Sequence, residues 1–168
     1  KEKCPYCGGT DLKLVERKYL ITKLLKCKCC HLMHRHPKDN PYFLRKFYQK
    51  EYQVSAELMT DLPSQDKLEA LMRDNFSSQR DFSYFRLLFP VRKIKMVDYG
   101  CSWGYNVFKL NNSGIDAVGF EISVPRADYG RKNLAVEIAD QVNNIREGND
   151  IFFSSHTIEH LASIGDFV

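Results

Sequence analysis

Two pairs of cysteines near the start of the chain constrain its fold more than any other feature. Each pair has CxxC spacing and 19 residues separate the pairs, which are Cys4 with Cys7 and Cys27 with Cys30. A CxxC turn can present two thiolates from one knuckle, and two knuckles complete the tetrahedral sulfur shell that zinc prefers. Gly8 and Gly9 permit the positive φ that such turns need. The sequence therefore predicts a small β zinc ribbon over residues 1–36.

The predicted metal has a structural role, because a ribbon of this size cannot bury enough apolar surface to fold alone. A disulfide framework is the main alternative. It suits small secreted domains, but not the odd count of five cysteines in residues 1–36 or the lack of a secretory apolar stretch in residues 1–10. Cys29 is then a spare thiol. His31, His34 and His36 could replace a cysteine as ligands, although histidines beside lysines are more often solvated surface.

Charge also divides the chain. Residues 1–50 hold 13 Lys and Arg against 4 Asp and Glu, whereas residues 51–168 hold 12 against 17. Helix signals fill the connecting segment, residues 37–90, with starts at Asn40-Pro41 and Pro63-Ser64 and an aromatic periodicity that continues to Phe89. We expect a helical connector whose apolar stripe packs in a core rather than binding a ligand.

Strand and helix signals alternate through residues 91–168. Short apolar strands are expected at 94–99, 116–120, 135–139 and 150–155, with helices at 105–110 and 123–133. In residues 1–36, short strands are expected at 12–15 and at 19–21 followed by Leu24-Leu25. The alternation predicts an α/β domain with a Rossmann-like parallel sheet and a ligand at the carboxyl ends of its strands.

The turn Gly100–Gly104 after the first of these strands allows three interpretations. As a dinucleotide fingerprint GxGxxG it fails, because Ser102 and Tyr105 stand where glycines are required. As GxSxG it matches the nucleophile elbow of serine esterases with the α/β-hydrolase fold, and Asp150 and His156 or His160 follow in triad order. Such an elbow normally follows several strands, whereas a ribbon and helices precede this one.

In the third interpretation, Val97–Gly104 resembles motif I of class I S-adenosylmethionine-dependent methyltransferases, DxGxGxG, with Ser102 in place of one glycine. Glu121 lies 21 residues after Gly100, where a carboxylate can accept both ribose hydroxyls. Asp150–Leu161 is similar to the fourth-strand motif of these enzymes. The resemblance covers residues 91–168, and a cysteine-rich head joined to such a domain is a familiar pairing in this superfamily, including sugar methyltransferases.

The resemblance implies S-adenosylmethionine as the cofactor, a partial seven-strand methyltransferase fold, and a role for each matching residue. It assigns the methionine-side loop to Asp98, Gly100, Ser102 and Gly104. It makes Glu121 the ribose acceptor, Ile122 an apolar wall for adenine and Asp140 an acceptor for the adenine amino group. His156 would lie beside the transferring methyl as a base. We expect Glu159 and His160 to cap and pack under the site, with a catalytic role as the alternative.

Residues His156–His160 also match HxxEH, the inverted zinc-protease motif, but no downstream carboxylate ligand follows. A seven-strand sheet needs three strands beyond the four expected here. The sequence is therefore interpreted as a fragment or a degenerate form, which leaves the activity of these 168 residues alone in question.

The basic head predicts an anionic acceptor. We favour a small acceptor, a nucleotide-linked sugar or other metabolite, over structured RNA, because Tyr6 and Tyr19 are too few aromatics for a base-stacking platform. An RNA methyltransferase is the first alternative function, and a GxSxG serine esterase is the second. For the basic head, a purely structural or protein-binding ribbon is the further alternative. The longest apolar run is shorter than the roughly 18 residues of a membrane span, so we expect a soluble, cytoplasmic protein without a membrane partner. The sequence does not indicate the oligomeric state.

Overall fold

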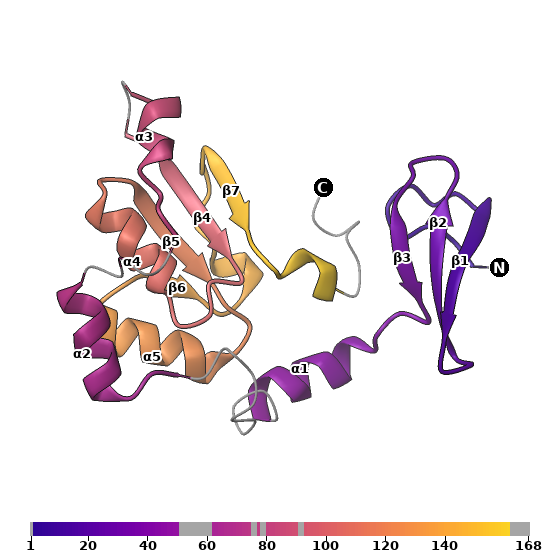
Figure 1. Ribbon diagram of the computed structural model, residues 1–168, viewed down its shortest axis with the longest axis horizontal. Coiled ribbons are helices and arrows are strands. Elements are labelled where there is room, and N and C mark those ends of the chain that lie inside the picture. The colour runs from indigo at the N-terminus through magenta and orange to yellow at the C-terminus, as the bar shows by residue number, and fades with distance from the viewer. Residues whose placement is uncertain (1, 51–61, 75–76, 78–79, 91–92, 162–168) are drawn as a thin grey trace. The chain divides into compact units, whose positions relative to one another are not determined.

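The computed structural model describes residues 2–50, 62–74, 77, 80–90 and 93–161 (Figure 1). The described residues fall into two compact units, one within residues 2–44 together with 158–161 and one within residues 45–157 apart from the gaps just given. The boundary falls inside helix α1 (Pro41–Lys50), so the last six residues of that helix belong to the second unit. The expected segments 1–36, 37–90 and 91–168 stay predictions.

The first unit contains a three-stranded antiparallel sheet in the order β1-β2-β3. Its strands are β1 (Leu12–Lys18), β2 (Thr22–Cys27) and β3 (Met33–His36). Among the described residues of this sheet and its loops, the buried apolar side chains are those of Cys4, Leu25 and Cys27. So small a core stabilises little by itself, which agrees with a fold that needs a metal.

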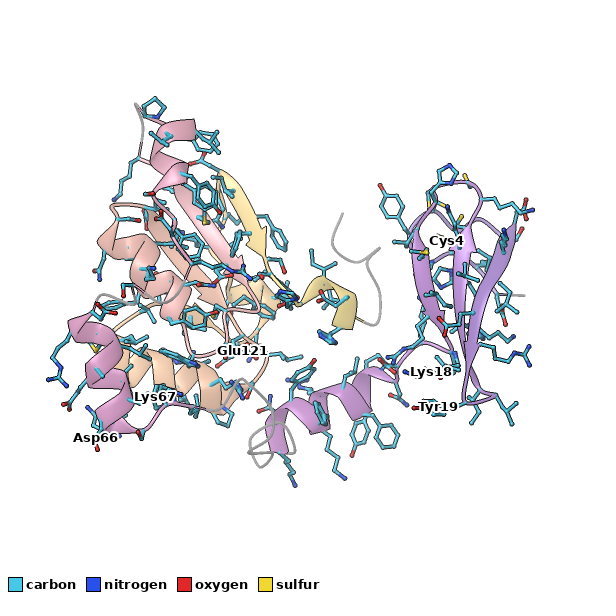
Figure 2. The ribbon with its side chains drawn as sticks, viewed as in Figure 1. Cys4, Lys18, Tyr19, Asp66, Lys67 and Glu121 are labelled. Atoms are coloured by element: carbon cyan, nitrogen blue, oxygen red, sulfur yellow. The ribbon has the colours of Figure 1, made fainter. Side chains whose placement is uncertain are left out.

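Of the second expected ribbon strand, Leu24 and Leu25 lie in β2, but the part at 19–21 is wrong. Tyr19 and Leu20 have positive φ values of 53° and 61°, and together with Ile21 they form the turn between β1 and β2. This turn lies at the opposite end of the ribbon from Cys4 (Figure 2). Left-handed backbone in a hairpin turn matches the twist of the strands, and here it occurs at Tyr and Leu, which rarely adopt it.

The second unit contains a parallel sheet in the order β6-β5-β4-β7. The strands are β4 (Lys95–Tyr99), β5 (Asp116–Phe120), β6 (Ile138–Ala139) and β7 (Ile151–Ser154). Helix α4 (Tyr105–Asn112) connects β4 to β5, and α5 (Val124–Leu134) connects β5 to β6. The predicted α/β class with a parallel sheet is confirmed. Strand order reverses between β4 and β7, which is where ligands bind in open parallel sheets.

Two further helices pack on this unit, α2 (Gln65–Arg73) and α3 (Tyr84–Leu88). Leu68 of α2 and Phe85 of α3 join the same buried cluster as Met96 of β4 and Leu110 of α4. The expectation that the aromatic periodicity is core packing therefore holds at Phe85, which lies 6.3 Å from Phe153 between ring centroids. The same expectation is wrong for Leu88 and Phe89, whose side chains are exposed. Phe76, which belongs to the same periodicity, lies outside the described residues.

The expected strand at 135–139 is reduced to Ile138–Ala139. Ala135 has a φ of 53° and ends α5 in the left-handed conformation, so the chain cannot extend until after it. Short 3-10 turns follow at Val142–Asn144 and Ile158–His160. Within the described ranges, every helix is too short or too polar to cross a bilayer.

Candidate functional site

The four cysteines of the two CxxC pairs form one cluster. Their sulfur atoms all lie within 4.8 Å of one another. Sulfurs of different pairs lie close together, with 3.5 Å from Cys4 Sγ to Cys30 Sγ and 3.6 Å from Cys7 Sγ to Cys27 Sγ. Four sulfurs at about 2.3 Å from a zinc ion are about 3.8 Å apart, whereas a disulfide needs about 2.05 Å. The spacing therefore fits a tetrahedral ion, and all six cysteines of the chain are free thiols.

The two knuckles have matching backbone turns. The residue after the second cysteine is left-handed in each, with a φ of 71° at Gly8 and 62° at His31. In the second knuckle, backbone hydrogen bonds from Cys30 and then Cys29 lower the pKa of Cys27 to about 7, against the effect of burial. Amides that point at a sulfur favour the thiolate, which is the form that binds metal.

The histidines considered as alternative ligands lie outside this cluster. His31 supplies the turn described above, and His36 Nε2 lies 3.2 Å from Glu2 Oε1. His34 is half-buried on β3, and its Nε2 atom has no hydrogen-bond partner among the described residues. The metal-type cluster found in the described part of the chain is made of cysteines alone.

The second candidate site lies at the carboxyl ends of β4 and β5. The loop after β4 is attached to the end of β5, because the amides of Gly100 and Cys101 both donate to the Phe120 carbonyl, at 2.8 and 3.0 Å. Gly100, Ser102 and Gly104 have positive φ values of 81°, 54° and 81°. Such a loop turns sharply out of the strand and leads directly into α4.

Protein packing explains both glycines of this loop. A side chain at Gly100 would overlap Thr157, which follows β7, and one at Gly104 would come within 2.9 Å of both Val136 and Ile138. Gly100 therefore lets the loops after β4 and β7 approach each other. The glycines fit a crowded strand end whether or not a ligand is bound there.

Glu121 ties the ends of the two strands together, and it is 7% exposed at the carboxyl end of β5 (Figure 2). Its Oε2 accepts from the Ser102 amide at 2.9 Å, and its Oε1 accepts from the Ser123 amide at 2.8 Å. Burial raises the pKa of Glu121, while these hydrogen bonds and the charge of Arg126 oppose the rise. Each carboxylate oxygen can accept a second hydrogen bond, so Glu121 keeps capacity for a ligand hydroxyl.

Arg126 is a buried cation of this site that sequence reasoning missed. It is 1% exposed in the first turn of α5, and its Nη1 donates to Ser102 Oγ at 2.9 Å. A nucleophilic serine needs a base that accepts its proton, whereas a guanidinium only donates. The contact therefore disfavours the esterase interpretation. The sequence shows only that an arginine stands three positions after Ser123 in the first helical turn. This position does not predict that the Arg126 side chain points into the site.

Asp98 is the most deeply buried acid of the site, at 1% exposure on β4. Burial raises its pKa to about 7, against a hydrogen bond with the Asn106 side chain and the charge of Arg80. Its Oδ2 atom has no hydrogen-bond partner among the described residues. An oxygen left in that state is costly unless a ligand or a proton satisfies it.

Three other predicted residues, Ile122, Asp140 and His156, follow strands of the same sheet. Ile122 is 36% exposed directly after Glu121. Asp140 follows β6 and lies 3.1 Å from the Arg131 guanidinium, so it already has a cationic partner. His156 is exposed after β7, next to the Thr157 that meets Gly100, and has a φ of 55°. Glu159 and His160 lie on the 3-10 turn that belongs to the other unit.

No protein-family model and no curated protein matches the chain significantly. Solved structures do resemble it. A structure of the plantazolicin methyltransferase BpumL in complex with SAH has a TM-score of 0.42 and 14% identity, over 72% of this chain and 49% of that one. A second BpumL structure, with monoazolic desmethylPZN analog and SAH, has a TM-score of 0.32 and 21% identity, over 54% and 32%.

A geranyl diphosphate C-methyltransferase from Streptomyces coelicolor A3(2), with Mg2+, geranyl diphosphate and S-adenosyl-L-homocysteine, has a TM-score of 0.30 and 19% identity, over 69% of this chain and 46% of that one. This chain thus spans half or less of the length of each of these proteins. At these identities and TM-scores the resemblance does not identify the ligand of this chain.

Proposed function

We propose that the second unit binds S-adenosylmethionine at the ends of β4 and β5, and that the whole protein transfers its methyl group to a small acceptor. One observation carries the proposal. The carboxylate of Glu121 is buried at the end of β5 and hydrogen-bonds to the Ser102 amide of the loop after β4. A carboxylate at this position of a parallel sheet accepts the hydroxyls of a nucleoside ribose.

The same loop favours S-adenosylmethionine over a dinucleotide. A pyrophosphate needs glycines where the loop meets its helix, because the backbone must approach the phosphates. Here Tyr105 begins α4 and its ring lies 5.1 Å from that of Trp103, which is buried. Bulky aromatic rings at this point suit a cofactor without phosphates.

The residues fit such a cofactor in charge as well as in position. When bound, S-adenosylmethionine supplies an electrophilic methyl group on a sulfonium. Glu121 would accept its ribose hydroxyls beside Ile122, and the free Oδ2 of Asp98 would accept from its ammonium. Gly100, Ser102 and Gly104 would hold the methionine side, and Asp140 would reach the adenine amino group through the oxygen that Arg131 leaves available.

His156 is the proposed base. It is exposed after β7, and Thr157 beside it packs on Gly100, so the histidine lies where β4 and β7 reverse the strand order. An imidazole there would take a proton from a hydroxyl or carbon acceptor as the methyl group is transferred.

We further propose that the cysteine cluster holds one structural zinc ion. The sulfur spacing described above and the small core of the ribbon support this. Four free thiols also persist most readily in a reducing compartment, and the cytoplasm is therefore the proposed location.

An anionic acceptor is proposed from the charge of the ribbon. Lys13 of β1 and Lys26 of β2 are exposed and stand directly opposite each other. Like charges in that position destabilise a sheet unless an anion lies between them. A nucleotide-linked sugar suits so compact a pair, and structured RNA is the second candidate because the first 50 residues carry an excess of nine positive charges.

Methyl transfer from labelled S-adenosylmethionine tests the proposal, with a panel of nucleotide sugars and total RNA as acceptors. We expect label on a nucleotide sugar, lost in Glu121→Ala. Label on RNA, lost on reversing the charges of Lys13, Lys18 and Lys26, would replace our acceptor with the second candidate. Labelling of Ser102 by a fluorophosphonate would instead show a serine esterase.

A further inference from the structure

Gln49 of α1 binds the backbone on both sides of Ser123. Its Nε2 donates to the Ile122 carbonyl at 2.6 Å, and its Oε1 accepts from the Val124 amide at 3.3 Å. Both bonds join residues of the second unit, although 73 positions of sequence separate Gln49 from Ile122. A single amide side chain thus satisfies a carbonyl and an amide of the segment between β5 and α5.

This segment needs an outside partner. Val124 is the first residue of α5, and the amides of a first helical turn have no acceptor within the helix. Ser123 occupies the capping position, but its side chain makes no capping hydrogen bond. Its own backbone amide is committed to Glu121 Oε1. Gln49 therefore supplies the acceptor that the local sequence does not.

Glu121 and Gln49 together hold three consecutive residues, 122–124. Glu121 fixes Ser123 through its amide, and Gln49 fixes the neighbours on either side. Any displacement of this segment moves the Glu121 carboxylate relative to the Ser102 amide, since Ile122 follows Glu121 directly. The position of the Glu121 carboxylate matters for binding. A small displacement of it would weaken both hydrogen bonds that it is proposed to accept from the ribose hydroxyls.

We propose that Gln49 is a positioning residue of the cofactor site, which sets the Glu121–Val124 segment for a nucleoside ligand. It acts through the backbone and need not touch the ligand. The inference rests on the proposed function above and adds that a helix from before the parallel sheet is part of the site. The cofactor-binding unit then begins within α1, not at residue 91.

Gln49→Met tests this, because methionine keeps the length of the side chain and removes both hydrogen bonds. Gln65→Met is the matched control, since Gln65 is an exposed glutamine of α2 that bonds only one turn along, to Glu69. Hydrogen exchange of the Val124 amide reports the contact without any ligand. We expect faster exchange in Gln49→Met and no change in the control.

Calorimetry with S-adenosylhomocysteine and with adenosine then reports the coupling. We expect Gln49→Met to weaken both ligands by about three- to tenfold, as for one or two lost hydrogen bonds. The loss should shrink when Glu121→Ala is already present, because both residues act through one segment. A merely structural role would lower the melting temperature and leave this coupling at zero.

Unchanged Val124 exchange would overturn the inference at its first step. Faster exchange with affinities within twofold of the wild type would overturn the positioning role and leave the proposed function intact. A wild-type protein that binds neither ligand would overturn the proposed function and this inference together.

Discussion

Glu121 and Ser102 are joined across the ends of two strands, with the carboxylate Oε2 of Glu121 2.9 Å from the backbone nitrogen of Ser102. The bond places the buried carboxylate of Glu121 beside the loop that follows β4. That loop turns sharply through three residues with positive φ. A ligand hydroxyl bound to Glu121 would therefore lie next to the loop where a cofactor's reactive end is proposed.

Glu121→Ala should weaken S-adenosylhomocysteine binding by about 1–3 kcal/mol, because hydrogen bonds from two hydroxyls to a charged acceptor are lost. Calorimetry on folded protein measures this. Glu137→Ala is the control, since Glu137 is exposed and its side chain has no part in the site. Equal affinities of the two variants would contradict the ribose role of Glu121.

Asp98 should make the folded protein less stable as the pH rises from about 4 to about 7. Burial raises its folded pKa to about 7 from an ordinary 3.8. In that window the folded state keeps a proton that the unfolded chain has lost, so the free energy of unfolding falls with increasing pH. The total effect is on the order of a few kcal/mol.

Asp98→Asn has no such proton, so its stability should depend less on pH than that of the wild type. Urea unfolding at several pH values, followed by the fluorescence of the buried Trp103, measures both proteins. The difference between them isolates Asp98 from the other acids. Parallel curves across pH 4 to 7 would show that Asp98 is charged throughout.

One zinc ion per chain is expected, bound by the four clustered cysteines. Cys27→Ser should abolish stoichiometric zinc, because one of the four sulfur ligands is removed. Cys29→Ser should keep it, since Cys29 is exposed and lies outside the cluster. Elemental analysis of protein purified with reductant measures the zinc content per chain. Equal zinc contents in the two variants would show that the four clustered cysteines are not the ligands.

The matching turns of the two knuckles give opposite expectations for two substitutions. Gly8→Ala puts a β-carbon on a residue with a φ of 71° and should destabilise the ribbon by about 1 kcal/mol. His31→Gly relieves a φ of 62° and should leave the ribbon as stable or more so, with its zinc retained. Competition with a chelator measures zinc retention. Zinc loss in His31→Gly would make that histidine a ligand.

Local signals predicted most of the fold. The strands and helices of the parallel sheet follow from apolar runs bounded by glycine and proline, which act within a few residues. Strand β3 was missed because its four residues, Met33–His36, contain three polar ones, and pairing with β2 rather than composition makes it a strand. The turn at Tyr19 and Leu20 was missed because it contains no glycine or asparagine to mark it.

The residues of the candidate site could likewise be predicted only where a local sequence pattern marks them. Glu121 was found because a fixed spacing separates it from the loop after β4. Arg126 and Gln49 were missed because their contacts lie 24 and 73 residues away along the chain. No local pattern encodes such distances, and only the packing of the loops and helices around the parallel sheet brings these residues together.

Titration of S-adenosylhomocysteine into the zinc-loaded wild-type protein by calorimetry tests the central claim most directly. We predict saturable binding at one molecule per chain, with no comparable heat from NAD. The contrary result is a folded protein that gives no saturable signal with S-adenosylhomocysteine, or one that binds NAD in its place.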